Sequence, residues 1–295
     1  MTRFRLIATT ALAVAFIAGT ARASDLASAL TVTPQWLAAH LNDPDLVVLH
    51  VGDRGQYNRK HIPGARYIAL DDIAVDSDGL SLQMPQPADL KARLEKLGIS
   101  DRSRIVVYYG QDWISEATRV VFTLYAAGLG DHVSLLDGGL NKWTGPLSDK
   151  ASQTTTGHLS DLHIRPVVVD QAFVKAHLTA PGYDIIDARA RVFYDGIQPG
   201  GPMMHMKRGH IPGARSVPYT SFNTDDLTMK TPDQARAIFA AAGIKPGDHV
   251  IAYCHIGQQA TEVLFAAREA GIDAVLYDGS FEDWAIHNQP VTMGH

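Results

Sequence analysis

The strongest constraint on the fold is an internal duplication, because both halves of the 295-residue chain carry the same landmarks in the same order. Offsets between matched segments range from 134 to 149 residues, so the loops of the two halves differ in length. A chain of this kind is expected to fold as two similar domains in tandem. The matched segments are residues 60–66 and 209–215, 97–109 and 242–254, 137–143 and 278–284, and the pairs Asp53-Arg54 and Asp187-Ala188-Arg189.

Each half alternates short apolar runs with helical patterns. In the second half the helix predicted at 232–242 has Thr231 at its N-cap, Pro232 at its first position and Gly243 directly after its end. The alternation predicts an α/β fold in which each domain is a mainly parallel sheet with helices on both faces. The other predicted elements are strands at 183–187, 249–253 and 274–277 and a helix at 259–270.

A polar stretch at 145–163, rich in Ser, Thr and Gly, separates the two patterns. We therefore place the first domain at 24–150, a linker at 151–165 and the second domain at 166–295.

Residues 1–23 have the three regions of a secretory signal peptide. Arg3 and Arg5 precede an apolar run at 6–18, and Ala21-Arg22-Ala23 offers a cleavage site. The run is shorter than the roughly 20 residues of a transmembrane helix, although an uncleaved anchor is the alternative. We expect an exported protein, periplasmic if the source is a Gram-negative bacterium, with no membrane attachment after cleavage. The net charge of −5 leaves no basic field for nucleic acid.

The chain has a single cysteine, Cys254, which excludes an intramolecular disulfide framework and Cys-rich zinc or iron-sulfur sites. Cys254 ends a predicted parallel strand, and a short loop leads from it into a helix. Backbone N–H groups in such a loop favour a thiolate or an anionic persulfide, and Gly257 allows the tight turn. We predict that Cys254 is a nucleophile rather than an inert buried thiol, and that it is surrounded by His255, Ile256, Gly257, Gln258 and Gln259.

A nucleophilic cysteine between strand and helix is typical of phosphatases and of sulfur-transfer enzymes. The phosphatase pattern requires an arginine six residues after the cysteine to clamp phosphoryl oxygens. Here that position is Ala260, and the loop contains no other arginine. The sequence therefore disfavours a phosphatase.

These residues resemble a known family, the tandem-domain rhodaneses, which are thiosulfate and 3-mercaptopyruvate sulfurtransferases. The resemblance covers essentially the whole mature chain. It rests on the two His-Ile-Pro-Gly-Ala segments, on the Tyr-Cys-x-x-Gly-x-x-Ala loop at 253–260, and on the segments at 136–143 and 277–284. It implies two tandem rhodanese-like domains, of which the second is catalytic. At the position of Cys254 the first half has Tyr109, or Gln111 by a count from the helix, and neither carries a persulfide.

The mechanism that the resemblance implies is a double displacement without a metal or an organic cofactor. Cys254 takes the outer sulfur of a small-molecule donor as a persulfide, held by the backbone of residues 255–259. A thiophilic acceptor such as cyanide or a thiol then removes that sulfur. A protein sulfur acceptor is an alternative partner, and a noncatalytic persulfide carrier or interaction protein is the alternative from another class.

The loop departs from both branches of the family. The thiosulfate branch has two basic residues before the glycine and the mercaptopyruvate branch has Gly-Ser, whereas this chain has His255 and Ile256. We expect His255 to be charged only in part near neutral pH. Since Ile256 replaces the serine proposed to handle a proton, thiosulfate is the favoured donor. The alternatives are mercaptopyruvate and a different donor, either a persulfide or a polysulfide.

The arginine that binds substrate in the family is also displaced, because Phe193 occupies its position. Arg191, two residues earlier, is a candidate clamp for a sulfonate or carboxylate. Arg189 is a second candidate, although it is expected to hold the loop by pairing with a carboxylate.

Three further features have a structural interpretation. The insertion with Met203, Met204, His205 and Met206 is interpreted as an apolar flap, with a Cu(I) site as the alternative. The histidines of the two His-Ile-Pro-Gly turns are expected to bond to nearby backbone. The tryptophans that end the third pair of matched segments are expected to anchor the core.

Overall fold

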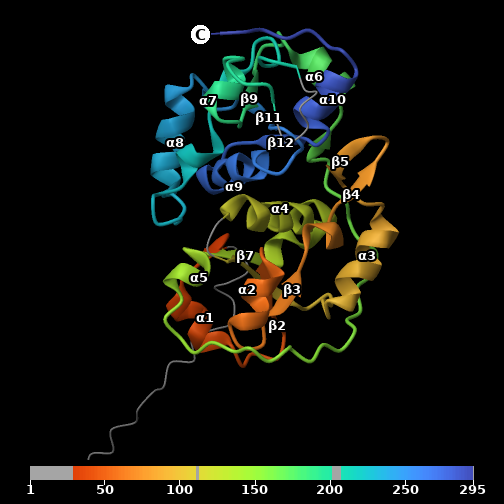
Figure 1. The fold of residues 1–295 in the computed structure, drawn as a ribbon, viewed down its shortest axis with the longest axis vertical. Helices are drawn as coiled ribbons and strands as arrows, with labels where there is room; N and C mark the ends of the chain where they lie inside the picture. Colours follow the sequence, from red (N-terminus) through yellow and green to blue (C-terminus); the bar gives the residue numbers. More distant parts are fainter. Residues whose placement is uncertain (1–28, 111–112, 201–206, 295) are drawn as a thin grey trace, which may run out of the picture.

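The structure is a computed structural model that describes residues 29–110, 113–200 and 207–294. Two α/β domains follow one another along the long axis of the molecule (Figure 1). The predicted signal peptide at 1–23 and the segment from Met203 to Met206 lie outside the described residues. Within the described ranges, no helix has the length and apolar character needed to cross a membrane.

The first domain is built on a parallel sheet of five strands in the order β1-β7-β6-β2-β3. These strands are β1 (Thr31–Val32), β2 (Leu46–Val51), β3 (Arg66–Ile68), β6 (Arg104–Tyr109) and β7 (Val133–Leu136). The helices are α1 (Pro34–His40), α2 (Arg54–Arg59), α3 (Pro87–Lys96), α4 (Ile114–Leu124) and α5 (Gly139–Lys142), with short helical turns at Leu70–Asp72, Tyr125–Leu129 and Gly130–His132. An antiparallel hairpin, β4 (Val75–Ser77) and β5 (Leu80–Gln83), extends toward the second domain (Figure 1).

The second domain repeats this topology, because its parallel sheet has the order β8-β12-β11-β9-β10. Its strands are β8 (Val168–Val169), β9 (Tyr183–Asp187), β10 (Arg215–Ser216), β11 (His249–Tyr253) and β12 (Ala274–Tyr277). Its helices are α6 (Gln171–His177), α7 (Arg191–Tyr194), α8 (Pro232–Ala241), α9 (Ala260–Ala270) and α10 (Ser280–Ile286), with one helical turn at Tyr219–Phe222. The predicted duplication and the α/β class are confirmed.

Local sequence signals mark the ends of the elements as predicted. Thr231 caps α8 and forms a capping box with Gln234, since each side chain accepts a hydrogen bond from the other residue's backbone N–H. Gly243 and Gly271 follow α8 and α9 with φ of 87° and 73°, a left-handed conformation that glycine adopts at little cost.

The central strands are buried on both faces, as helices on both sides of a sheet require. Along β11, Val250 and Ala252 pack in one core with α8 and α9, whereas Ile251 and Tyr253 pack in another core with Trp284 of α10. Strand β6 alternates in the same way between two cores of the first domain. Trp143 and Trp284 are both buried, which confirms their predicted role as core anchors.

The two His-Ile-Pro-Gly turns are held in matching ways. The His61 Nδ1 lies 2.7 Å from the carbonyl oxygen of Tyr57, and the His210 Nδ1 lies 2.8 Å from that of Tyr194. In each turn the next backbone N–H donates to a tyrosine hydroxyl at the end of a central strand. The structural role predicted for both histidines is confirmed.

Residues 151–165 contain no helix or strand, and they run along the first domain (Figure 1). Leu159 is buried in the core of that domain, and the Gly157 N–H donates to the Glu95 carbonyl oxygen at 2.7 Å. A Cβ atom on Gly157 would lie 2.0 Å from the carbonyl oxygen of Ile99, so this position requires glycine. The segment is therefore packed against the first domain rather than free.

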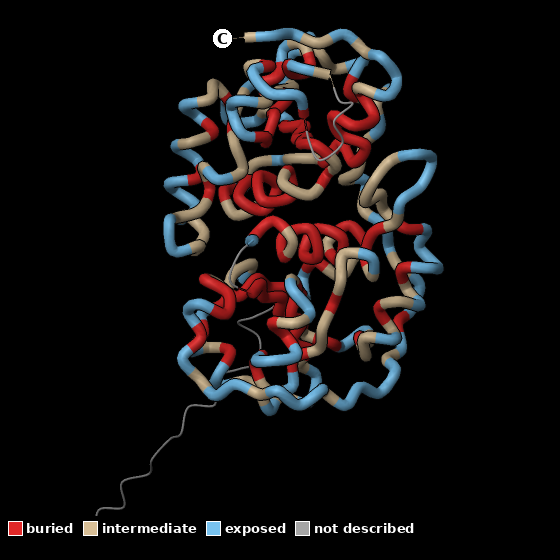
Figure 2. The backbone as a smooth tube through the Cα atoms, viewed as in Figure 1, coloured by how far each residue is buried: buried red, intermediate tan, exposed pale blue. Residues whose placement is uncertain are grey.

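Helices α4 and α9 form the centre of the contact between the domains, and both are almost entirely buried (Figure 2). Phe265 of α9 packs into the core of the first domain, and Phe122 of α4 packs into the core of the second. This exchange of aromatic side chains joins the two cores across the interface.

Candidate active site

The side chain of Cys254 is fully buried at the end of β11, the central strand of the second sheet. The start of α10 holds its backbone on both sides. The Cys254 N–H donates to the Ser280 Oγ at 3.2 Å, and the Phe281 N–H donates to the Cys254 carbonyl oxygen at 3.0 Å. Its position between the sheet and α9 agrees with the predicted strand–loop–helix placement.

The loop from Cys254 to α9 presents unused hydrogen-bond donors. None of the backbone N–H groups of residues 255–259 has an acceptor among the residues that the structure describes. Gln259 is the N-cap of α9, a helix of 11 residues whose positive dipole end lies at this loop. Free N–H groups beside a helix N-terminus suit an anion, and a thiolate or persulfide on Cys254 is such an anion.

Gly257 is required at the turn of this loop, because its φ is +82° and its surroundings are tight. A Cβ atom would lie 2.8 Å from the carbonyl oxygen of Asp278 and 3.0 Å from Nη1 of Arg119. The tight turn predicted from the glycine is confirmed, and the neighbouring arginine comes from the first domain.

Arg119 of α4 was not found by the sequence analysis. Its side chain is fully buried, and it donates to the Gly257 carbonyl oxygen at 3.0 Å and to Asp278 Oδ1 at 2.7 Å. The only local signal is a basic residue directly before the apolar residues 120–122 of α4. These two partners lie 138 and 159 residues away in the chain, so their proximity is a property of the fold.

His255 differs from the sequence-based expectation of partial charge. It is 8% exposed, and its ring packs edge-on against Phe193 with centroids 4.7 Å apart. Burial, assisted by the positive charge of Arg189, lowers the pKa of His255 to about 4. The imidazole is therefore neutral near neutral pH, and the expected partial charge is wrong because burial removes the solvation that would support it.

Arg189 forms a fully buried ion pair with Asp187 at the end of β9, as predicted. Its Nη2 lies 2.6 Å from Asp187 Oδ2, its Nε lies 2.9 Å from Oδ1, and Nη2 also donates to the Gly209 carbonyl oxygen at 2.7 Å. Burial has the largest single effect and acts to lower the pKa of Arg189, but the charge and the hydrogen bonding of Asp187, together with smaller effects of Tyr253 and Cys254, raise that pKa overall. The Nη1 atom has no partner among the described residues, and a role of Arg189 in binding the substrate stays a prediction.

The remaining predicted site residues lie in different surroundings. The Arg191 side chain is 60% exposed and pairs with Asp195 at 3.3 Å, so its role as a substrate clamp stays a prediction. Ile256 packs against the core beside β11. The Gln258 Nε2 donates to Ser115 Oγ of α4 at 3.2 Å.

Of the two positions in the first domain that could match Cys254, Gln111 lies outside the described residues, and Tyr109 lies at the end of β6. Its side chain is buried, and its hydroxyl donates to the carbonyl oxygen of Leu227 in the second domain. Tyr109 thus forms a hydrogen bond across the contact between the two domains.

Glu262, in the first turn of α9, is a buried carboxyl group that the sequence analysis also missed. Its Oε1 accepts a hydrogen bond from Asn223 Nδ2 at 2.6 Å, and its Oε2 has no partner among the described residues. Burial raises the pKa of Glu262 to about 8.

From the raised pKa of Glu262 we expect the free energy of unfolding to decrease as the pH rises. Because its folded pKa lies above its unfolded pKa, its contribution is complete below about pH 4.5 and is lost as the pH rises through 8. In wild type the free energy of unfolding should fall across this range, and in Glu262→Gln this fall should be smaller by a few kcal/mol. The size follows from about 1.4 kcal/mol for each unit by which the pKa is shifted. Urea unfolding at several pH values measures it, with the exposed Asp233→Asn as control. Equal pH dependence in wild type and Glu262→Gln would contradict the prediction.

Comparison with known proteins supplies the family context of this geometry. The model of the rhodanese-like domain matches twice, at residues 33–146 and 170–287. A probable 3-mercaptopyruvate sulfurtransferase of Pseudomonas aeruginosa is 32% identical over 91% of this chain and 100% of its own length. Thiosulfate sulfurtransferase of Rattus norvegicus is 27% identical over 88% of this chain and 93% of its own. The solved structure of wild-type EanB is 25% identical with a TM-score of 0.81, covering 90% of this chain and 69% of that one.

Proposed function

This chain belongs to the rhodanese family of sulfurtransferases, and from that premise we propose that it moves sulfur from thiosulfate to a thiophilic acceptor through a Cys254 persulfide. One observation carries the proposal: the buried thiol is followed by a loop whose backbone N–H groups, at residues 255–259, lack acceptors among the described residues. A persulfide anion on Cys254 is the group that these donors and the start of α9 would stabilise.

The reaction is two successive displacements at sulfur. The Cys254 thiolate attacks the outer sulfur of thiosulfate; the new S–S bond forms as the old one breaks, and sulfite leaves with the electron pair. Cyanide or a thiolate then attacks the terminal sulfur of the persulfide, and Cys254 leaves as the original thiolate. Atoms and charge balance in both steps without an added oxidant or reductant.

The residues beside Cys254 favour a donor whose leaving group needs no proton. Sulfite leaves thiosulfate as a stable anion, whereas cleavage of the C–S bond of mercaptopyruvate leaves a carbon that must be protonated. Ile256 has no hydroxyl group, and the neutral His255 is a poor acid near neutral pH. The second candidate donor is 3-mercaptopyruvate, favoured by the similarity of 91% of this chain to the probable 3-mercaptopyruvate sulfurtransferase of Pseudomonas aeruginosa.

Thiocyanate formation from each donor tests the proposal. We expect kcat/KM for thiosulfate to exceed that for 3-mercaptopyruvate by at least about tenfold, which corresponds to roughly 1.4 kcal/mol of transition-state discrimination. A preference for mercaptopyruvate would overturn the assignment of the donor. If folded, reduced protein forms thiocyanate from neither donor, the hypothesis of an enzyme is overturned and that of a noncatalytic persulfide carrier is left.

A further inference from the structure

We propose that Arg119, a residue of the noncatalytic domain, is a positioning residue for the persulfide loop, so that the first domain completes the active site of the second. The inference rests on the proposed function, because it assigns a role at the same loop. It explains why a domain without a nucleophile stays packed against the loop that follows the thiol.

Arg119 connects three separate segments from a fully buried position. It donates to the carbonyl oxygen of Gly257 in the loop, to the Asp278 carboxylate after β12, and to the Leu82 carbonyl oxygen in the β4–β5 hairpin, at 3.0, 2.7 and 2.5 Å. Asp278 also accepts a hydrogen bond from the Met84 N–H at 2.8 Å. A buried guanidinium with such partners has little freedom to move, so Gly257 is held against a rigid group.

The contact with Gly257 fixes the orientation of a peptide in the loop. In a trans peptide the C=O group and the following N–H point in opposite directions. When Arg119 holds the Gly257 carbonyl oxygen, the Gln258 N–H is turned away from α4. That N–H is one of the donors without an acceptor among the described residues. Arg119 thereby aims a donor that the proposed persulfide requires.

Two neighbours of Arg119 on the same face of α4 support the loop further along. Thr118 Oγ1 lies 2.9 Å from Thr261 Oγ1, and Ser115 Oγ accepts a hydrogen bond from the Gln258 side chain at 3.2 Å. The Thr261 hydroxyl also lies within 2.6 Å of the Gln258 carbonyl oxygen. The polar residues of α4, spaced three and four apart, therefore meet successive residues from Gly257 to the first turn of α9.

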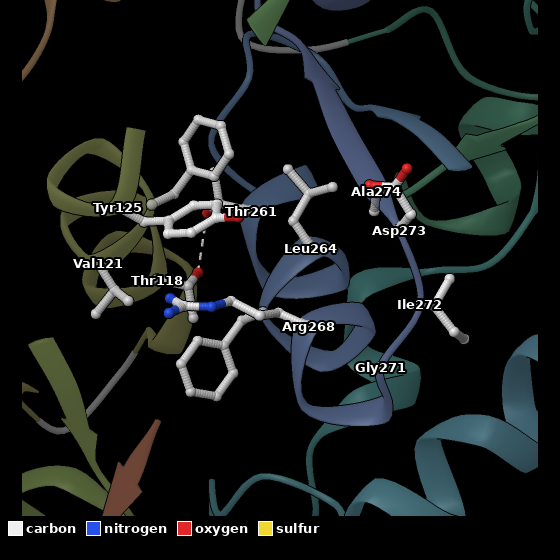
Figure 3. Close-up of a pocket in the computed structure, with 12 residues that line it drawn as sticks. Thr118, Val121, Tyr125, Thr261, Leu264, Arg268, Gly271, Ile272, Asp273 and Ala274 are labelled. Carbon is white, nitrogen blue, oxygen red and sulfur yellow. Dashed lines mark hydrogen bonds between the residues drawn. The ribbon is translucent and has the colours of Figure 1, made fainter. Parts of the chain in front are cut away.

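A second arginine crosses the same interface without touching the loop. Arg268 of α9 donates to the Gly130 carbonyl oxygen at 3.1 Å, and its guanidinium carbon lies 4.1 Å from the centre of the Tyr125 ring. A cavity of about 280 Å³ lies along the α4–α9 contact between this arginine and the Thr118–Thr261 pair (Figure 3). Arg268, whose side chain is 26% exposed, is thus a control for an interdomain arginine at the end of the interface away from Cys254.

The test compares Arg119→Gln with Arg268→Gln. The readouts are kcat, KM and the rate of Cys254 alkylation by iodoacetamide from about pH 5 to about pH 9, which reports the thiolate directly. We expect Arg119→Gln to lower kcat by about tenfold to hundredfold and to displace the alkylation profile toward higher pH. Arg268→Gln is expected to keep kcat and the profile within about twofold of wild type, with any loss confined to thermal stability.

Arg119→Lys keeps the buried charge and provides the second variant if Arg119→Gln does not fold. We expect the alkylation rate of Arg119→Lys to lie below that of wild type and above that of Arg119→Gln. An ammonium group is expected to reach only one or two of the three oxygen acceptors that Arg119 contacts. An unchanged alkylation profile in folded Arg119→Gln or Arg119→Lys would overturn the inference, as would parallel losses in the Arg119 and Arg268 variants. Alkylation requires no sulfur donor, so it tests the role of Arg119 even in an inactive protein. A wild-type protein that is inactive with every donor would therefore overturn the proposed function but not the role of Arg119.

Discussion

Replacing Cys254 with serine is expected to reduce thiocyanate formation by at least about 10³-fold, to the level of the uncatalysed reaction. A serine hydroxyl remains protonated near neutral pH and forms no persulfide. The first displacement therefore lacks its nucleophile, and the second lacks the persulfide that the acceptor attacks. Cys254 is the only cysteine in the chain, and no second thiol takes over. Initial rates with thiosulfate and cyanide, measured on protein kept reduced, give the comparison.

Cys254→Ala separates the loss of the thiol from any effect of a buried hydroxyl. The Cys254 side chain packs in the core with α8 and α9, so serine costs some stability by placing a polar group there. Both variants should be inactive while circular dichroism and thermal unfolding show a folded protein. Retention of a tenth or more of wild-type activity in either variant would rule out the Cys254 persulfide as the route.

The second large effect is expected on stability, from breaking the buried pair of Asp187 and Arg189. Asp187→Asn should lower the free energy of unfolding by about 3–5 kcal/mol, because it leaves an uncompensated guanidinium in a fully buried site. The Tyr253 hydroxyl also donates to Asp187, at 2.6 Å, and would lose its charged acceptor. Urea unfolding monitored by tryptophan fluorescence measures the loss.

The double variant Asp187→Asn with Arg189→Met is the control for this interpretation. Removing the stranded charge together with its partner should recover a large part of the lost stability. The exposed pair of Asp233 and Arg236 provides the baseline. Asp233→Asn should lower the free energy of unfolding by less than about 1 kcal/mol. Additive losses in the double variant would show that the two side chains do not depend on each other.

The parts of the fold that depend on local signals could be predicted from the sequence. Repeated turns and glycines located the duplication, and Thr231 with Pro232 and Gly243 gave the bounds of α8 to within one residue. The loop after Cys254 was found for the same reason, since a strand, a tight glycine turn and a helix are consecutive in the chain. The pairing of Arg189 followed from an aspartate two residues away.

What the sequence did not reveal depends on tertiary burial and on contacts between domains. His255 looks like a partly charged residue until Phe193 and the surrounding core remove its solvent. Arg119 lies in a helix of the other domain, and nothing beside it in the chain indicates that Gly257 and Asp278 are its partners. The Glu262 oxygen that has no partner in the described part of the chain likewise results from packing, because the same residue on an exposed helix would be an ordinary ionised side chain.

The most direct test of the persulfide is the intact mass of the protein after incubation with thiosulfate and without an acceptor. Wild type is predicted to gain the mass of one sulfur atom, located on the peptide that contains Cys254, and to lose it when cyanide is added, with one equivalent of thiocyanate released. Cys254→Ser is predicted to gain nothing. A wild-type protein that turns over thiosulfate without ever gaining this mass, or a Cys254→Ser variant that gains it, would contradict transfer through Cys254.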